Sequence, residues 1–166
     1  GGGCVYSDMG NIMISYVSRR GDVSEIFDRY LSALTACLRS LGLNAEKSGR
    51  NDILVEGRKV SGNAFHQLPD RSIVHGTLLY STDLEALTEA IRPPVEKLER
   101  HGVQSVRQRV MNVADIVSQL PEPHDALKSV EALESFIVEY FTNDEICLTD
   151  DDISKIEELS EQYKII

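Results

Sequence analysis

The sequence predicts an α+β fold, because strand-like patterns dominate its first half and helical patterns dominate its last third. Few strand–helix–strand repeats occur, so a parallel sheet built from repeated βαβ units is not expected. The chain has 166 residues, of which 42% are hydrophobic and 27% are charged. This size and composition fit one globular domain with a sizeable core.

The first predicted elements are a strand over residues 11–17 and an amphipathic helix over residues 24–41. Apolar residues in the second interval recur three and four positions apart, which is the period of a helix with one buried face. Asp22 and Glu25 form a capping-box pair at its start, and Gly42 is a stop signal. The predicted buried face comprises Ile26, Phe27, Tyr30, Leu31, Leu34, Cys37, Leu38 and Leu41.

A β-rich segment follows this helix. Residues 53–56 and 60–66 flank the turn sequence Gly57-Arg58-Lys59, which predicts a β-hairpin with glycine at the turn. Residues 72–81 form a third apolar strand pattern. Asp83 then caps a short helix that runs to Ile91 and ends before two prolines.

The remaining chain is predicted to be helical, over residues 113–120, 125–141 and 149–163. Acidic residues at the start of the last helix suit its N-terminus, where they oppose the helix dipole. We therefore divide one domain into a core, residues 1–120, and a helical C-terminal part, residues 121–166.

Charge and composition exclude several classes of protein. The formal net charge of −10 argues against a general nucleic-acid binder, which needs clustered lysine and arginine. No run of about 18 apolar residues is present, so a membrane helix is not expected. The three cysteines lack a C-x-x-C motif and are predicted to be free thiols in a reducing compartment.

Four clusters contain residues that could carry chemistry. The glycine-rich residues 1–11 could lay backbone N–H groups against a phosphate. Asn51 and Asp52 could bind phosphate and a magnesium ion, which prefers one or two carboxylates together with substrate oxygens. Taken alone, a flexible glycine tail and an ordinary Asn-Asp turn explain these patterns as well.

The other two clusters lie in the predicted strands. Lys59 stands at a strand entrance, where its ammonium could reach a phosphate, and small residues follow it at Ser61, Gly62 and Ala64. His75-Gly76-Thr77 places a glycine inside an apolar strand, as at a bulge or a ligand contact. A solvated lysine and a core histidine remain the ordinary alternatives.

Together, the order and spacing of these clusters resemble one family. The strings are GGGCVYSDMGN (1–11), RNDI (50–53), GRKVSGNAF (57–65), VHGTLL (74–79) and GVQSVRQRVMN (102–112). In this order they resemble lipoate–protein ligase A, and the resemblance covers residues 1–112 closely. The helical tail fits the family's layout without a distinctive motif.

The resemblance implies a fold and a reaction. The expected fold is the biotin/lipoate-ligase, class II synthetase-like α+β fold, with a mixed, largely antiparallel sheet flanked by helices. The expected activity is formation of lipoyl-AMP from lipoate and MgATP, followed by lipoyl transfer to a lysine of an acceptor protein. The implied acceptors are the lipoyl domains of 2-oxo acid dehydrogenase complexes and the glycine-cleavage H-protein, in the cytoplasm or, in a eukaryote, the mitochondrion.

The resemblance also implies roles for residues of this chain. Lys59 matches the family's essential lysine, and Asp52 is the implied metal ligand. The implied nucleotide-binding residues are Gly2, Gly3, Cys4, Val5, Tyr6, Asn11, Asn51, Asp52 and Lys59. The implied lipoate-binding residues are Lys59, Ser61, Gly62, Ala64, His75, Gly76 and Thr77.

This chain departs from the family pattern at three places. Ser7 stands where members usually have histidine, which puts any role of that histidine in doubt. An arginine-containing segment before the glycines and a tryptophan-rich segment after residue 166 are absent. We therefore expect a catalytic unit that is truncated at both ends.

Two other functions stay open on sequence grounds. An ATP-independent lipoyl or octanoyl transferase of the same fold would use a nucleophilic cysteine. Cys4 and Cys147 do not lie where such a nucleophile is expected, and the Asn51-Asp52 pair favours the ATP route. The second alternative is a fragment that only binds lipoate or nucleotide. Biotin attachment is disfavoured because it uses a different glycine-and-arginine motif.

Overall fold

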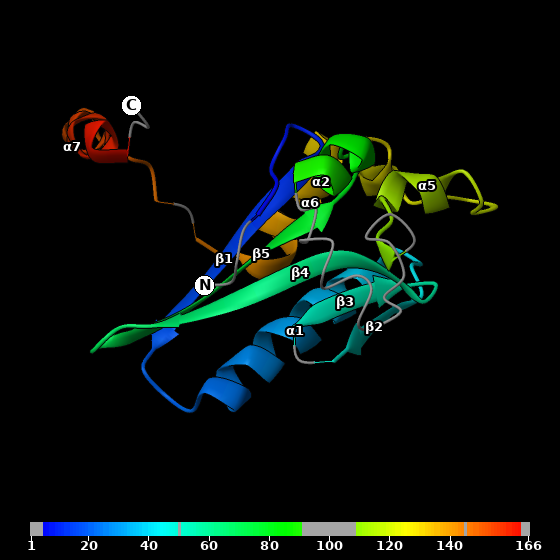
Figure 1. The fold of residues 1–166 in the computed structure, drawn as a ribbon, viewed down its shortest axis with the longest axis horizontal. Coiled ribbons are helices and arrows are strands. Elements are labelled where there is room, and N and C mark those ends of the chain that lie inside the picture. The colour runs from blue at the N-terminus through cyan, green and yellow to red at the C-terminus, as the bar shows by residue number, and fades with distance from the viewer. Residues whose placement is uncertain (1–4, 50, 91–108, 145, 164–166) are drawn as a thin grey trace.

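The computed structural model describes residues 5–49, 51–90, 109–144 and 146–163, and its centre is a five-stranded sheet (Figure 1). All four strand ladders are antiparallel. One parallel bridge, between Lys59 and Val110, adds to them. The predicted α+β fold with a largely antiparallel sheet is therefore confirmed. The strands are β1 (Asn11–Arg19), β2 (Ala45–Ser48), β3 (Asp52–Val55), β4 (Arg58–Gln67) and β5 (Arg71–Leu79), in the order β1-β5-β4-β3-β2.

The two faces of the sheet differ in what covers them. Helices α1 (Val23–Ser40) and α6 (Val130–Phe141) share one hydrophobic core with the sheet. Aromatic contacts between Tyr16 and Tyr30, and between Phe65 and Phe27, join the core face to α1. On the opposite face, which we call the open face, Met13 and Val17 are 52% and 59% exposed. Along β1, the open face therefore presents exposed side chains.

Helix α1 forms as predicted, within one residue at each end. Asp22 Oδ1 accepts the Glu25 backbone N–H at 3.0 Å. At the other end, Gly42 has φ +84°, and the Leu43 N–H donates back to the Leu38 carbonyl at 3.3 Å. This 6→1 bond, together with the buried Leu38 and Leu43 side chains, is the Schellman ending that a glycine favours.

The Gly42→Ala change is expected to lower the free energy of unfolding by about 1–2 kcal/mol, because a Cβ is strained at positive φ. Space is not the cause, since no atom lies within 4 Å of the added Cβ. Urea unfolding should show a lower midpoint with an unchanged slope. Gly42→Asn, which tolerates this conformation better, should lose less; an equal loss in both variants would contradict the backbone explanation.

The predicted hairpin forms between β3 and β4, with its turn one residue earlier than predicted. Glu56 and Gly57 have φ of 49° and 74°, which is the type I′ geometry that matches the twist of paired strands. Arg58 and Lys59 therefore belong to β4 rather than to the turn. Strand β2 was not predicted, because its four residues, Ala45–Ser48, lack an alternating apolar pattern.

The helical segments after the sheet differ in detail from the prediction. The single helix predicted over residues 125–141 is wrong, because it is divided into a 3₁₀ turn, η1 (Asp125–Leu127), and α6. Ser129 is extended between them, and its hydroxyl accepts the Ala132 N–H at 3.1 Å as an N-cap. The short helices are α2 (Leu84–Ala90) and α5 (Val113–Val117).

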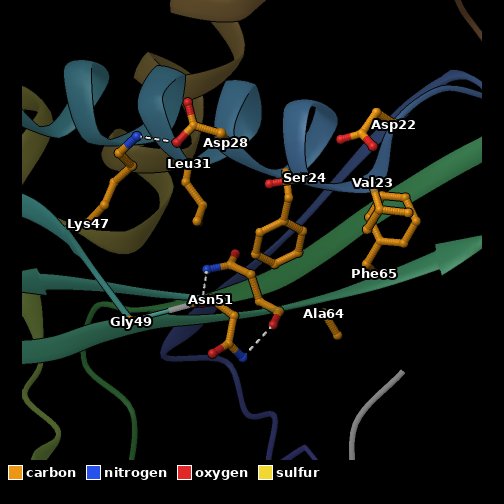
Figure 2. Close-up of a pocket in the computed structure, with 12 residues that line it drawn as sticks. Asp22, Val23, Ser24, Asp28, Leu31, Lys47, Gly49, Asn51, Ala64 and Phe65 are labelled. Carbon is orange, nitrogen blue, oxygen red and sulfur yellow. Dashed lines mark hydrogen bonds and ion pairs between the residues drawn. The ribbon is translucent and has the colours of Figure 1, made fainter.

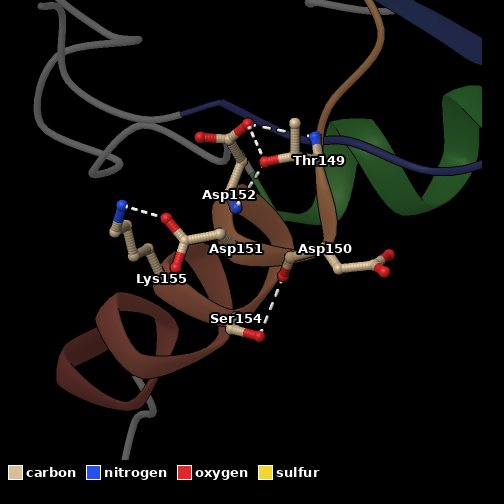
Figure 3. A network of polar contacts seen from close by, with 6 residues as sticks. All are labelled: Thr149, Asp150, Asp151, Asp152, Ser154 and Lys155. Carbon is tan, nitrogen blue, oxygen red and sulfur yellow. Dashed lines mark hydrogen bonds and ion pairs between the residues drawn. The ribbon is translucent and has the colours of Figure 1, made fainter.

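Helix α7 (Asp150–Ser160), followed by the 3₁₀ turn η2 (Glu161–Tyr163), confirms the last predicted helix. It stands apart from the sheet in Figure 1, and none of its residues is buried. Figure 3 shows its start, where the Thr149 hydroxyl accepts the Asp152 N–H at 3.2 Å while Asp152 Oδ2 accepts the Thr149 N–H at 3.0 Å. No helix in the described ranges is long and apolar enough to cross a bilayer.

Two buried groups make the stability of this core sensitive to alkaline pH. Burial raises the pKa of Tyr30 to about 12 and the pKa of Cys37 to about 11. Their values in the unfolded chain are about 10 and 8.5. The unfolded state therefore loses these protons first, and the stabilisation is complete below about pH 8.5 and lost as pH rises toward 11–12.

The free energy of unfolding is accordingly expected to fall by at least about 2 kcal/mol between pH 8 and pH 11, at about 1.4 kcal/mol per unit of pKa displacement. Urea midpoints measured across this range test the expectation. Cys37→Ala should flatten the decline above pH 8.5; a slope identical to that of the unsubstituted chain would contradict a contribution from the thiol.

Candidate functional site

A β-bulge in β4 decides which face of the sheet Lys59 occupies. Ser61 pairs with Ile53 but Lys59 pairs with Leu54, so Val60 is an extra residue in the ladder. Val60 and Ser61 are consequently both buried, at 0% and 1% exposure. The bulge shifts the alternation of side chains and brings Lys59 to the open face.

On the open face, Lys59 lies beside Asp52 and over Gly62. Lys59 Nζ is 2.7 Å from Asp52 Oδ1, and both side chains are about one-third exposed, at 34% and 32%. A Cβ added to Gly62 would lie 2.8 Å from both Cε and Nζ of Lys59. The missing side chain of Gly62 thus provides the space in which the ammonium meets the carboxylate.

Cross-strand rows show which of the predicted lipoate-binding residues share this face. One row runs through Thr77, Gly62 and Asp52. The next pairs His75 with Ala64. These small or half-buried residues form a continuous surface with Lys59. Ser61 and Gly76 lie in the alternate rows and do not reach it.

Gly76 instead makes room for a buried asparagine, Asn63, which was not among the predicted site residues. A Cβ on Gly76 would lie 2.0 Å from Asn63 Oδ1 and 2.8 Å from the Gly62 carbonyl oxygen. The Asn63 side chain is 4% exposed. The sequence does contain a signal for Asn63, because it places an amide between small residues in a strand. A buried amide needs hydrogen-bond partners, which indicates a structural or functional role.

Asn51, predicted to bind phosphate, is held by Asn63. Its Nδ2 donates to the Asn63 carbonyl oxygen at 2.8 Å, while Asn63 Nδ2 and N donate to the Asn51 carbonyl oxygen at 2.9 and 3.0 Å. Figure 2 shows Asn51 beside Ala64 with its side chain in these contacts. A phosphate role for Asn51 stays a prediction.

The N-terminal segment is described from Val5 onward, so the predicted Gly2, Gly3 and Cys4 lie outside the described residues. Val5 is 63% exposed, and Tyr6 packs against the small cluster formed by Leu79, Leu87 and Val110. Partial burial, followed by the nearby carboxylates of Asp8 and Asp83, raises the pKa of Tyr6 above its ordinary value.

Asp8 and Gly10 hold the turn before β1 against the segment that follows β5. Asp8 Oδ1 accepts the Gly10 N–H and its Oδ2 accepts the Asp83 N–H, each at 2.8 Å. A Cβ on Gly10 would lie 2.4 Å from the Ser81 carbonyl oxygen, so only glycine allows this approach. The adjacent Asn11 is buried, and its amide contacts the Ser7 hydroxyl and the Tyr6 carbonyl oxygen.

Residues 110–112, which are distant in sequence, form hydrogen bonds with the start of β4 and with the segment after β5. Arg58 Nη2 donates to the Val110 carbonyl oxygen at 2.7 Å, and the Met111 N–H donates to the Lys59 carbonyl oxygen at 2.9 Å. Asn112 bonds both the N–H and the carbonyl of Thr82. The basic residues between positions 92 and 109 lie outside the described residues, except for Arg109, which is exposed.

A groove of about 930 Å³ opens between the first half of α1, the end of β2 with the turn that follows it, and the middle of β4 (Figure 2). Phe27, Leu31 and Phe65 line its apolar part, and the Lys47–Asp28 ion pair lies at its edge. Neither Lys59 nor Asp52 lines it. Within the described residues, no group of three or more histidine, cysteine or acidic side chains is arranged to hold a metal.

Comparison with known proteins shows the family of the chain. Residues 1–141 match the lipoyl protein ligase A/B catalytic domain. The chain belongs to this family. Lipoate–protein ligase LplJ of Bacillus subtilis is 34% identical over 98% of the chain, and lipoate–protein ligase 1 of Staphylococcus aureus is 35% identical over 96%. The chain spans about half the length of these curated relatives, 49% and 48% respectively.

Solved ligases confirm the fold of this lipoyl protein ligase domain. A bi-partite lipoate protein ligase from Thermoplasma acidophilum, studied together with its E2 lipoyl domain, superposes with a TM-score of 0.73. It is 28% identical, and the match covers 98% of this chain and 64% of that one. A lipoate–protein ligase A bound with ATP superposes with a TM-score of 0.72 at 24% identity, over 95% of this chain and 64% of that chain.

Proposed function

We propose that this chain forms the adenylating part of a lipoate–protein ligase, and that it activates lipoate with MgATP before transfer to an acceptor lysine. The observation that carries the proposal is the Lys59–Asp52 pair above Gly62 on the open face. Membership of the lipoyl protein ligase A/B family supports it. So does a Thermoplasma acidophilum relative, 26% identical, that was solved with bound lipoic acid.

Adenylation requires a cation between two anions. A lipoate carboxylate oxygen attacks the α-phosphorus of ATP, a new O–P bond forms, and pyrophosphate leaves with the electrons of the broken bond. Without a positive charge the approaching carboxylate and triphosphate repel each other. The Lys59 ammonium stands on the open face and is positioned to lower that repulsion as negative charge develops.

The second half-reaction uses the same position. The amine of an acceptor lysine attacks the acyl carbon of lipoyl-AMP, an amide forms, and AMP leaves after loss of a proton from the amine. The Lys59 ammonium would polarise the acyl carbonyl during this attack. The carboxylate of Asp52 suits Mg²⁺, which binds through few protein carboxylates and several phosphate oxygens. The bound ion would supply further neutralisation of the triphosphate.

The open face also suits the acyl chain of lipoate. Gly62, Ala64, His75 and Thr77 form a surface of small or half-buried side chains that leads away from Lys59. Each methylene buried there would contribute about 0.8 kcal/mol to binding. Val5, Tyr6 and Asn11, together with Gly2, Gly3 and Cys4, are the proposed nucleotide contacts. Ser61 and Gly76 would act from beneath this surface.

The cysteine-dependent transferase finds no support among the described cysteines. Cys37 is fully buried in the core, and burial raises the pKa of its thiol to about 11, which disfavours the nucleophilic thiolate. Cys147 is exposed in the segment that precedes α7. Neither is part of the Lys59–Asp52 site. We propose acceptor lipoyl domains and H-protein as partners, and the cytoplasm (or the mitochondrion of a eukaryote) as the location.

Lipoate-dependent exchange of pyrophosphate into ATP, with detection of lipoyl-AMP by mass spectrometry, tests the proposal. It should be run on this chain and on a version extended at both ends, with an acceptor lipoyl domain added afterwards. Lipoyl-AMP formed by either version, followed by modification of one acceptor lysine, is the expected result. Acyl transfer from a carrier without ATP would instead establish the transferase, and binding without turnover would establish a binding-only fragment.

A further inference from the structure

Asn63 connects the interior of the sheet to the Asn51–Asp52 segment. Its backbone N–H and its side-chain Nδ2 both donate to the Asn51 carbonyl oxygen, at 3.0 and 2.9 Å. Its own carbonyl oxygen accepts from Asn51 Nδ2 at 2.8 Å. Three hydrogen bonds therefore fix the residue that directly precedes Asp52.

The Asn63 side chain is itself held from two sides. Ser61 Oγ lies 3.2 Å from Nδ2 and 3.4 Å from Oδ1, so the hydroxyl can accept from one and donate to the other. The amide fills the space that Gly76 leaves on β5, where a Cβ would lie 2.0 Å from Oδ1. A buried amide with satisfied partners has one orientation, and so do the groups bonded to it.

The consequence appears on the opposite face of the sheet. Asp52 is the next residue after Asn51, and it pairs with Gly62, the residue before Asn63. Its Oδ1 is 2.7 Å from Lys59 Nζ. Gly62 and Asn63 are adjacent in β4, so their positions face opposite sides of the sheet. Asn51 directly precedes β3, so holding Asn51 holds the backbone from which the Asp52 side chain projects.

We infer that Asn63, seated on Gly76, is a positioning residue that holds the Asp52 carboxylate against the Lys59 ammonium by clasping Asn51. The chemical part of this inference rests on the proposed adenylating function. Ser61 and Gly76 then serve the site as supports for Asn63, which explains why small residues stand on the face that does not carry Lys59. Misplacing a charged group near a reacting phosphate lowers the rate of the chemical step even when the substrate still binds.

The first experiment does not depend on activity. The side-chain ¹³Cε and ¹Hε resonances of Lys59 are recorded in the unsubstituted chain, in Asp52→Asn, in Asn63→Ala and in the double variant. Asn63→Ala is expected to move these resonances in the direction of Asp52→Asn, and to add little once Asp52 is replaced. Unmoved Lys59 resonances in a folded Asn63→Ala variant would overturn the inference.

The second experiment measures single-turnover formation of lipoyl-AMP as a double-variant cycle. Asn63→Ala should slow the step about 10-fold or more in the unsubstituted chain but less than about 2-fold in Asp52→Asn. The same factor in both backgrounds would mean that Asn63 acts only on general stability and would overturn the role. Leu133→Ala, which removes a fully buried apolar side chain of α6 that belongs neither to the site nor to the hydrogen bonds around Asn63, is the stability control.

If Asn63→Ala does not fold, Asn63→Asp replaces it in both experiments. This side chain keeps the size that fits Gly76 and loses the Nδ2 donor to the Asn51 carbonyl oxygen. It is expected to reproduce the resonance and rate effects. A fully active Asn63→Asp variant would contradict the positioning role of Asn63. Absence of lipoyl-AMP from the unsubstituted chain would count against the proposed function. The resonance experiment would still test whether Asn63 positions Asp52 against Lys59.

Discussion

Lys59→Ala is expected to lower lipoyl-AMP formation by at least about 10²–10³-fold, the usual effect of removing a group that stabilises charge in a transition state. The chain should remain folded, because the side chain is about one-third exposed and its ion pair with Asp52 is partly screened by water. The expected change in the free energy of unfolding is within about 1 kcal/mol. Lipoate-dependent pyrophosphate exchange and a urea midpoint on the same preparation measure the two quantities.

Lys47→Ala provides the matched control for this prediction. Lys47 is also paired with an aspartate, Asp28, and its side chain is 38% exposed. It lies on β2 against α1 and not on the open face beside Asp52. Lys47→Ala should therefore retain adenylation. An active Lys59→Ala chain, or an equal loss in both variants, would remove Lys59 from its proposed role.

Gly62→Ala is expected to slow adenylation by about 10–100-fold while keeping Lys59 in the sequence. The added Cβ would stand 2.8 Å from Cε and Nζ of Lys59, so the ammonium must leave its place beside Asp52. The contact is with the end of a flexible side chain, and Gly62 has no positive φ, so the backbone accommodates alanine. The thermal midpoint should change by only a few degrees, since alanine suits a strand at least as well as glycine.

Gly21→Ala is the control for Gly62→Ala. Gly21 lies before α1, has no positive φ, and its added Cβ would meet only the Ile26 side chain, at 3.3 Å. Adenylation by this variant should equal that of the unsubstituted chain. Normal adenylation by Gly62→Ala would show that the placement of Lys59 over Gly62 is not needed for the reaction.

Local patterns in the sequence determined most of the elements. The helical spacing of apolar residues between Ile26 and Leu41 predicted α1, and Gly42 predicted its end. Both could be predicted because these signals depend on residues within a few positions of one another. The Gly57 turn, the apolar run of β5 and the Thr149 cap of α7 follow for the same reason. The break between η1 and α6 was missed because the apolar period continues across Ser129.

The sequence also determined the family of the chain. Its long motifs, in a fixed order, made Lys59 and Asp52 candidate site residues. Alternation alone could not determine which face carries them. The bulge at Val60 arises from pairing between β3 and β4, and pairing register depends on contacts between residues far apart in sequence. Only the tertiary structure therefore placed Lys59 over Gly62, turned Ser61 and Gly76 to the other face, and revealed Asn63 between them.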